Sequence, residues 1–221
     1  MITIISAVCL VLSSNVQKIS EALGHLIGKH IENLDLPLDL NALAKGIEAE
    51  REGKESPLNE EECLEAINAL QKIKNNELAK KNTEEAEEFL TSNAKKSGVQ
   101  SLVDGKLQAK IIKEGSGQKV QPYNSPIVRI TGRYLDGKTF NTTHDEELIS
   151  LEESIPAFQL GVEGMQEGEV RTLYVHPEYG YGEEGHLNPG ALLIFDVEVV
   201  RADAATDEEI ALDSPANTSV Q

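Results

Sequence analysis

The spacing of apolar residues divides the chain into a helical first part and a strand-like second part. Residues 16–33 carry apolar side chains at intervals of three and four, which predicts an amphipathic helix; these are Ile19, Leu23, Leu26, Ile27 and Ile31. A second helix is expected to open at Leu38, with Asp39 as its N-cap, and to end at Gly53. Gly24 and Gly28 lie near the first apolar face, where small residues would let another helix approach closely.

The longest helical pattern covers residues 56–93. Asn59 followed by Glu62 resembles a capping box at its start. Between residues 75 and 88 the pattern is polar nearly all round, which is typical of a helix that bridges solvent between domains or frays. The apolar faces of the three helices contain few large side chains, and this favours pairing with a second chain. A helical hairpin within one chain remains the alternative.

From Val99 the periodicity changes to the alternation of β-strands, with turn signals rich in glycine between them. The expected strands lie within residues 102–111, 127–131, 139–140, 148–151, 169–175 and 192–200. Residues 154–161 form a short apolar stretch with Pro156 where a first helical turn would begin. We expect one or two turns of helix here, on the concave side of a sheet. From composition alone, an ordinary core helix is the alternative.

Both ends of the chain differ from the rest. Residues 1–12 are nearly all apolar and are followed by two serines, a length that suits a secretory signal peptide and is too short to span a bilayer. No basic residue precedes this run, so a buried N-terminal helix or strand is the alternative to a signal peptide over residues 1–14. The acidic, Ser/Thr/Ala-rich residues 203–221 are expected to be a disordered tail.

The composition excludes several functions. A net charge of −18 and a pI near 4.6 disfavour binding to nucleic acid or to anionic lipid. The two cysteines, Cys9 and Cys63, lack the spacing of a metal site, and no disulfide framework is available. The histidines also lack ligand spacing, so neither a metal nor another cofactor is expected.

Several separate motifs, in order and at matching spacing, resemble those of the FKBP-type peptidyl-prolyl isomerases between about residues 105 and 203. They are ITGRYLDGKTF at 130–140, IP at 155–156, GVEGM at 161–165, PEYGYG at 177–182 and LIFDV at 193–197. The N-terminal part resembles the Mip (macrophage infectivity potentiator) branch of that family. The similar motifs in that part are LGHLIGK at 23–29, AKGI at 44–47 and EFLTSN at 88–93.

The resemblance implies an α+β fold: an N-terminal all-α dimerisation region and a long linker helix, then an antiparallel β-sheet wrapped around a short α-helix. The corresponding segments are a helical dimerisation domain at 15–75, a linker helix at 76–98 and an isomerase domain at 99–202. It also implies export to the periplasm or outer membrane of a Gram-negative-type bacterium and a homodimer formed through the N-terminal helices.

The resemblance further implies a proline pocket whose positions carry over residue by residue. The expected catalytic residues are Asn141, Tyr181 and Phe195. The expected substrate-binding residues are Ile130, Phe140, Ile155, Phe158 and His186. Rotation about X–Pro bonds of unfolded or surface proteins needs no nucleophile, metal or redox centre, because the reaction only twists an amide bond.

Three pocket positions depart from the family pattern, which usually has Tyr at Ile130, Asp at Asn141 and Trp at Phe158. These changes remove an aromatic wall and a carboxylate and make the pocket floor smaller. They leave open whether the chain reaches full catalytic rate, and macrolide inhibitors are expected to bind weakly. A binding or chaperone module with weak or no turnover is therefore the alternative function. The segment between Thr143 and Ile155 is short and acidic, without an inserted domain.

Overall fold

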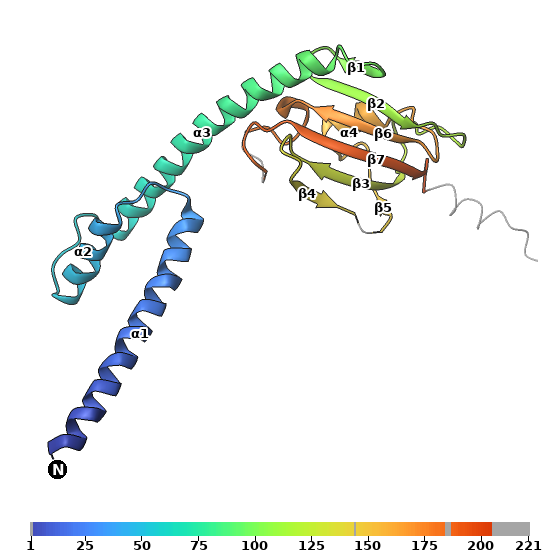
Figure 1. Ribbon diagram of the computed structural model, residues 1–221. Helices are drawn as coiled ribbons and strands as arrows, with labels where there is room; N and C mark the ends of the chain where they lie inside the picture. The colour runs from blue at the N-terminus through green and yellow to red at the C-terminus, as the bar shows by residue number, and fades with distance from the viewer. Residues whose placement is uncertain (1, 144, 184–186, 205–221) are drawn as a thin grey trace, which may run out of the picture. The chain divides into compact units, whose positions relative to one another are not determined.

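The computed structural model describes residues 2–143, 145–183 and 187–204, with side chains from residue 15 onward, and separates the chain into two compact units after Ile73. The first unit contains α1 (Ile2–Leu34), α2 (Leu40–Arg51) and the first part of α3 (Glu60–Asn93). The second unit contains the rest of α3 and the sheet (Figure 1). None of the helices in the described residues combines the length and apolar character needed to cross a membrane.

Local side-chain hydrogen bonds begin α2 and α3 where the sequence predicts them. The Asp39 carboxylate accepts hydrogen bonds from the backbone N–H groups of Asn41, at 2.8 Å, and Ala42, at 3.1 Å. Asn59 and Glu62 cap each other reciprocally, each backbone N–H donating to the other side chain at 2.9 Å. These contacts satisfy backbone donors that a helix leaves unpaired in its first turn.

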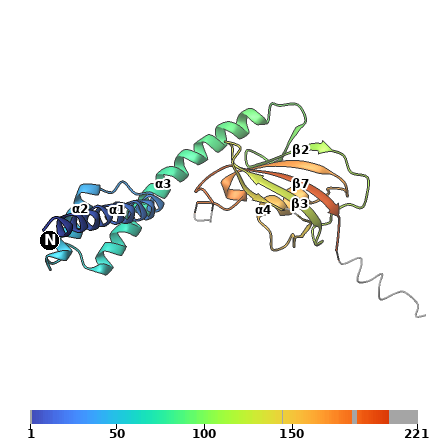
Figure 2. The ribbon, with the colours of Figure 1, turned by 60° about the horizontal axis from the view of Figure 1, so that its bottom comes forward.

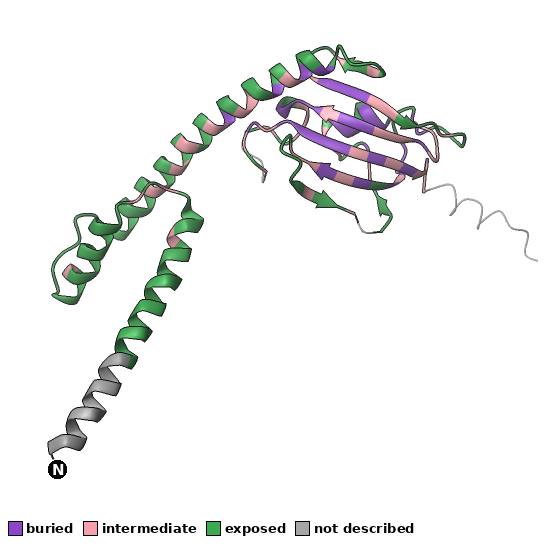
Figure 3. Ribbon diagram, in the orientation of Figure 1, coloured by how far each residue is buried: buried purple, intermediate pink, exposed green. Residues whose placement is uncertain are grey.

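The apolar faces of the first unit remain open to solvent. No residue from 15 to 73 is buried, and Ile19, Leu23 and Leu26 are 67%, 55% and 60% exposed (Figure 3). Large aliphatic side chains at such exposure lose the stabilisation that burial would give them. The unit therefore carries apolar surface that its own fold does not cover.

The second unit is built on an antiparallel sheet with the strand order β1-β2-β6-β7-β3-β4, and β5 pairs with β3 at the edge. This arrangement, with helices before it and a short helix against it, confirms the expected α+β fold. The strands are β1 (Val99–Val103), β2 (Leu107–Lys113), β3 (Ile127–Arg133), β4 (Thr139–Thr142), β5 (Glu147–Leu148), β6 (Val170–Val175) and β7 (Leu193–Arg201).

The strand expected at 148–151 is shorter and begins earlier, as Glu147–Leu148. After it the chain turns out of the sheet, because Ser154 bonds back to the carbonyl oxygens of Ser150, through its hydroxyl at 2.6 Å, and Leu151, through its N–H at 3.2 Å. This turn buries Leu151 and leads into α4.

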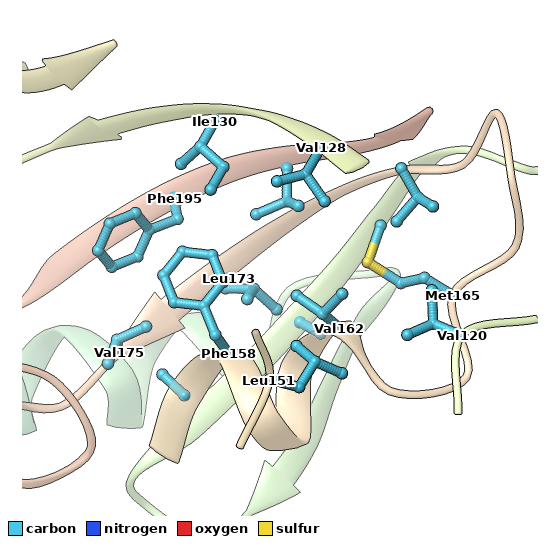
Figure 4. Packing of buried hydrophobic residues seen from close by; sticks show 14 of the residues in the cluster. Val120, Val128, Ile130, Leu151, Phe158, Val162, Met165, Leu173, Val175 and Phe195 are labelled. Atoms are coloured by element: carbon cyan, nitrogen blue, oxygen red, sulfur yellow. The ribbon is translucent and has the colours of Figure 1, made fainter. Parts of the chain in front are cut away.

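The short helix α4 (Pro156–Val162) lies across one face of the sheet, where the sequence predicts it (Figure 2). Pro156 occupies its first turn, where no intrahelical N–H is required. Phe158 and Val162 point from α4 toward Leu173 of β6 and Phe195 of β7 (Figure 4). This side of the sheet holds the main core.

The second half of α3 packs on the opposite face of the sheet, contrary to the solvent-bridging helix expected from its polar sequence. Ala86 and Leu90 are buried against Leu192 and Ile194. Alanine carries little apolar area. The buried face of α3, which includes Ala79 and Ala86, therefore does not produce a periodic pattern of large apolar side chains in the sequence. Small residues nevertheless allow the helix backbone to approach the sheet closely.

Two buried amides fix the end of α3 to β2. The Gln108 side chain donates to the Leu90 carbonyl at 2.7 Å and accepts from the Asn93 amide at 2.9 Å. The Leu90 carbonyl, in the last turn of the helix, also accepts a hydrogen bond from the Ala94 N–H at 3.0 Å, so Gln108 is its second donor. Both amides are thus satisfied in a buried position, as buried polar groups need to be.

A buried histidine follows β6 and caps the 3₁₀ turn η1 (Pro177–Tyr179). His176 is 1% exposed, and its Nδ1 accepts a hydrogen bond from the Glu178 N–H at 3.2 Å. Because Nδ1 accepts, the proton of the neutral ring is on Nε2, which lies 3.5 Å from the Lys106 ammonium. Burial, and then the Lys106 charge, lower the pKa of His176, although Glu178 and Glu87 oppose the shift.

This geometry predicts a loss of stability on acidification. Because the pKa of His176 is lower in the folded chain, the unfolded chain takes up a proton first as the pH falls below about 6.5. The stabilising contribution is therefore complete above that pH and is lost as the pH falls through the folded-state pKa. Urea unfolding between pH 7.5 and pH 5 should show a smaller loss for His176→Asn, whose side chain can still cap η1. If the unaltered protein and His176→Asn lose equal stability over this pH range, the loss does not come from His176.

Candidate functional site

A cleft of about 250 Å³ opens beside α4 on the concave face of the sheet. It is lined by Ile130, Asn141, Glu147, Ile149, Glu153, Ser154, Ile155, Phe158, Tyr181 and Phe195. Six of the eight residues predicted from the sequence thus come together here, from β3, β4, the start of α4, the loop after η1 and β7. The structure brings them together; their roles in binding and catalysis stay predictions.

Two phenylalanine rings form the floor of the cleft. Phe158 of α4 is 7% exposed and Phe195 of β7 is 2% exposed, and their ring centroids are 4.9 Å apart at an interplanar angle of 64°. Ile130 of β3 is 6% exposed and lies beside Phe195 (Figure 4). An edge-on aromatic pair of this kind is rigid and excludes water, so the floor suits a small apolar ring.

Phe140 does not line the cleft, although the sequence placed it among the substrate-binding residues. Its ring packs edge-on against the Phe195 ring, with centroids 5.6 Å apart, and against the Tyr134 ring, with centroids 4.9 Å apart. Gly132 makes this possible, because a Cβ there would come within 2.6 Å of the Phe140 ring and 3.1 Å of the Phe195 ring. Phe140 therefore contacts the floor of the cleft through Phe195.

Ile155 offers a backbone donor at the mouth of the cleft. Its carbonyl accepts from the N–H groups of Phe158, at 2.9 Å, and Gln159, at 3.2 Å, so the residue is held as the N-cap of α4. Its own N–H has no acceptor among the described residues. Because Pro156 follows and has no N–H, Ile155 supplies the last free donor before the helix.

The rim is polar, and its acidic members were not singled out by sequence reasoning. Tyr181 is 45% exposed, and its hydroxyl, like the Asn141 amide, has no hydrogen-bond partner among the described residues. Glu147 and Glu153 also line the cleft. The acidic segment between Thr143 and Ile155 was the signal for them, but a run of charges does not reveal which side chains face a cleft.

The acidic segment also pairs with a basic side chain that does not line the cleft. Arg129, on β3, contacts Glu146 at 2.6 Å and Glu198 at 2.9 Å. The hydrogen bond to Glu198 raises the pKa of Arg129, and so does Glu146. Its charge is therefore balanced by two carboxylates, and the Glu147 and Glu153 charges dominate the rim. His186, the remaining predicted residue, lies outside the described residues.

This arrangement is suited to binding and poorly suited to nucleophilic chemistry. Among the described lining residues, the hydroxyl of Ser154 is engaged with the Ser150 carbonyl, and no histidine or cysteine lies beside it. What remains is an apolar floor, one backbone donor, and neutral and acidic polar groups at the rim. A site of this kind can hold an apolar ring while hydrogen bonds orient the adjoining amides.

Two family models together match most of the chain. Residues 16–111 match the domain amino terminal to FKBP-type peptidyl-prolyl isomerase, and residues 116–200 match the FKBP-type peptidyl-prolyl cis-trans isomerase family. The peptidyl-prolyl cis-trans isomerase Mip of Chlamydia pneumoniae is 38% identical over 210 residues, which cover 93% of this chain and 80% of that protein.

More distant relatives agree with this match. The outer membrane protein MIP of Legionella longbeachae is 27% identical over 202 residues, covering 86% of both chains. The crystal structure of FkpA from Escherichia coli superposes with a TM-score of 0.66 at 25% identity, covering 84% of this chain and 97% of that one. The likeness thus extends over the N-terminal helices as well as the sheet.

Proposed function

The chain belongs to the FKBP-type peptidyl-prolyl cis–trans isomerases, and we propose that it assists the folding of exported proteins by holding the proline of an X–Pro bond in the cleft. The activity itself, rotation about X–Pro peptide bonds, follows from the family. The observation that supports the proposed pocket is the aromatic floor of Phe158 and Phe195 beside an Ile155 N–H that has no acceptor among the described residues.

The chemistry required is the weakening of amide resonance. The barrier to rotation is roughly 18–20 kcal/mol because the C–N bond has partial double-bond character. The twisted transition state has less charge separation than the planar amide, so an apolar floor disfavours the ground state relative to it. The pyrrolidine ring lies on Phe158 and Phe195, while the rest of the peptide stays at the polar rim.

The rim residues hold the peptide in the proposed mechanism. The Ile155 N–H donates to a substrate carbonyl next to the proline, and the Tyr181 hydroxyl donates to another. Asn141 presents a neutral amide where most of the family has a carboxylate, and it contacts the rotating segment. Each of these groups acts by orientation, because none of them exchanges a proton with the substrate.

Client binding with slow turnover is the second candidate function. The smaller Phe158 floor and the neutral Asn141 favour it, since both changes keep an apolar cleft while removing features that the family uses around it. Suppression of client aggregation that survives Tyr181→Ala unchanged, while isomerisation falls, would support this role. Parallel loss of both activities would favour the isomerase alone.

We place the protein in the periplasm or at the outer membrane of a Gram-negative-type bacterium. The apolar residues 1–12 support export, and the Legionella relative carries the name of an outer membrane protein. A signal peptide over residues 1–14 would be removed on export, so the folded protein would begin near residue 15.

The N-terminal unit is proposed to form a homodimer. Its exposed apolar side chains lie on α1, on α2 (Leu40, Leu43) and on the first half of α3 (Leu64, Leu70) (Figure 3). A second copy is the occupant that offers a matching apolar surface of the same kind. Two clefts carried by one dimer would bind a client with several prolines more tightly than either cleft alone.

Replacement of Tyr181 tests the proposed pocket directly. Tyr181→Ala should lower kcat/KM for a proline tetrapeptide by roughly five- to tenfold, the size of one hydrogen bond with its packing. Stability should change little, because the ring is 45% exposed. Tyr123→Ala is the matched control, since Tyr123 is 74% exposed and lies outside the cleft. Rates measured by NMR exchange that fall equally in both variants, or in neither, would refute the assignment.

The acidic rim predicts a preference for basic clients. A peptide with lysine immediately before proline should have a kcat/KM about two- to fivefold above its glutamate counterpart for each rim carboxylate, and the difference should shrink at high salt. Glu147→Gln combined with Glu153→Gln should remove the preference. Glu152→Gln, a neighbouring exposed change outside the lining, should retain it. An unchanged lysine-to-glutamate ratio in the double variant would disprove the preference.

The dimer is tested by light scattering on the chain from residue 15. The unaltered protein should have twice the mass of one chain, whereas Leu23→Lys with Leu26→Lys should give monomers, because charges would replace apolar contacts at the interface. Ile112→Lys is the control, because Ile112 is similarly exposed, at 57%, but lies on β2. A monomeric unaltered protein at micromolar concentration would exclude the dimer.

A further inference from the structure

The loop that follows Tyr181 is closed at its base by a backbone hydrogen bond. The Gly190 N–H donates to the Gly182 carbonyl at 3.1 Å, so the two ends of the loop are held side by side. Tyr181, at the rim of the cleft, is the residue immediately before this closure. Whatever fixes Pro189 and Gly190 therefore also fixes the backbone next to Tyr181.

Asn82 of α3 holds Pro189 in place through a hydrogen bond. The Asn82 Nδ2 donates to the Pro189 carbonyl at 2.8 Å, and the bond is partly buried. The two residues are 107 positions apart in the sequence. A partly shielded amide bond of this kind is worth about 1 kcal/mol and, more importantly, defines the position of the carbonyl.

The backbone of Gly190 lies directly against the same turn of α3. A Cβ on Gly190 would be 2.4 Å from the Ala79 carbonyl oxygen and 2.8 Å from the Thr83 hydroxyl, and Gly190 has a φ of +65°. Ala79 itself is 2% exposed. Only glycine satisfies both the close approach and the left-handed conformation, so the loop base rests on the helix with no side chain between them.

A second chain of contacts runs from the loop base to the floor of the cleft. The Asn188 N–H donates to the Tyr134 hydroxyl at 3.3 Å. The Tyr134 ring packs against the Phe140 ring, with centroids 4.9 Å apart, and the Phe140 ring packs against the Phe195 ring, with centroids 5.6 Å apart. Asn82, Tyr134 and Asn188 also line one small cavity of about 140 Å³. The helix, the loop base and the aromatic floor are thus neighbours in one connected group.

We propose that Asn82 of α3 is a positioning residue for the isomerase site, acting through Pro189, Gly190 and Gly182 on Tyr181. It lines a different cavity from the proposed proline cleft and does not touch the substrate. Its effect is to hold the Tyr181 hydroxyl at the rim in the orientation that binds the peptide. The proposal rests on the proposed function in taking the cleft as the proline site.

The test is a double-mutant cycle in the full chain. Asn82→Ala should lower kcat/KM for a proline tetrapeptide by roughly two- to tenfold, as expected for one lost hydrogen bond. In the Tyr181→Ala background the same change should have almost no further effect, because residues that act through one group are not additive. An additive loss in the two backgrounds, or full activity of the folded Asn82→Ala protein, would overturn the proposal.

Thr83→Val is the matched control on the same turn of α3. The Thr83 hydroxyl is buried and has no hydrogen-bond partner among the described residues, so its removal keeps the packing and loses no bond. Its kcat/KM should equal that of the unaltered protein. A loss as large as that of Asn82→Ala would show that general packing on α3, and not the Asn82 bond, determines activity, and would also overturn the proposal.

Tyrosine ring resonances give a readout that does not depend on activity. In protein labelled with ¹³C-tyrosine, and with Tyr181 assigned from Tyr181→Phe, Asn82→Ala should shift the Tyr181 signals and leave those of Tyr123 in place. Unshifted Tyr181 signals would refute the positioning role even if the enzyme were active. An inactive unaltered protein with shifted Tyr181 signals would instead refute the proposed function and leave the positioning role supported.

Discussion

The two-sided packing of β7 is the constraint on which the rest of the second unit depends. Phe195 and Val197 face α4 and form the core beneath the cleft, whereas Ile194 faces the other side, where α3 covers it. Because side chains alternate along a strand, a shift of one residue would exchange these two sets. The same nine-residue strand, Leu193–Arg201, therefore positions both the floor of the site and the surface on which α3 packs.

This constraint lets the cleft combine a dry floor with a polar rim. Burial of Phe158 and Phe195 contributes roughly 1.5–3 kcal/mol for each side chain, so the rings are held by folding as well as being available to a ligand. Phe140 packs against Phe195 over Gly132, which leaves room for both rings by having no side chain. The Ile155 N–H and the Tyr181 hydroxyl, which have no partner within the part of the chain that the structure describes, lie at the open edge, where water can reach them.

The sequence predicted what depends on local pattern or on motif spacing. The caps at Asp39 and Asn59, the alternation of β6, the apolar run of β7 and the short helix with Pro156 all follow from neighbouring residues. The cleft positions came from the family resemblance and not from periodicity. The docking of α3 was missed because Ala79 and Ala86 carry too little apolar area to produce a pattern. The Asn82 contact joins residues too far apart in sequence for any local signal.

The small size of the buried residues on α3 explains both why its role was missed and why it can serve the site. A helix that packed through leucines would stand farther from its neighbour, and its backbone could not approach Gly190. With Ala79 at the contact, the helix reaches the loop backbone itself, and Asn82 can bond a main-chain carbonyl. The first half of the same helix carries exposed Leu64 and Leu70. The same helix therefore carries exposed leucines in its first half and a small residue where it meets the loop backbone.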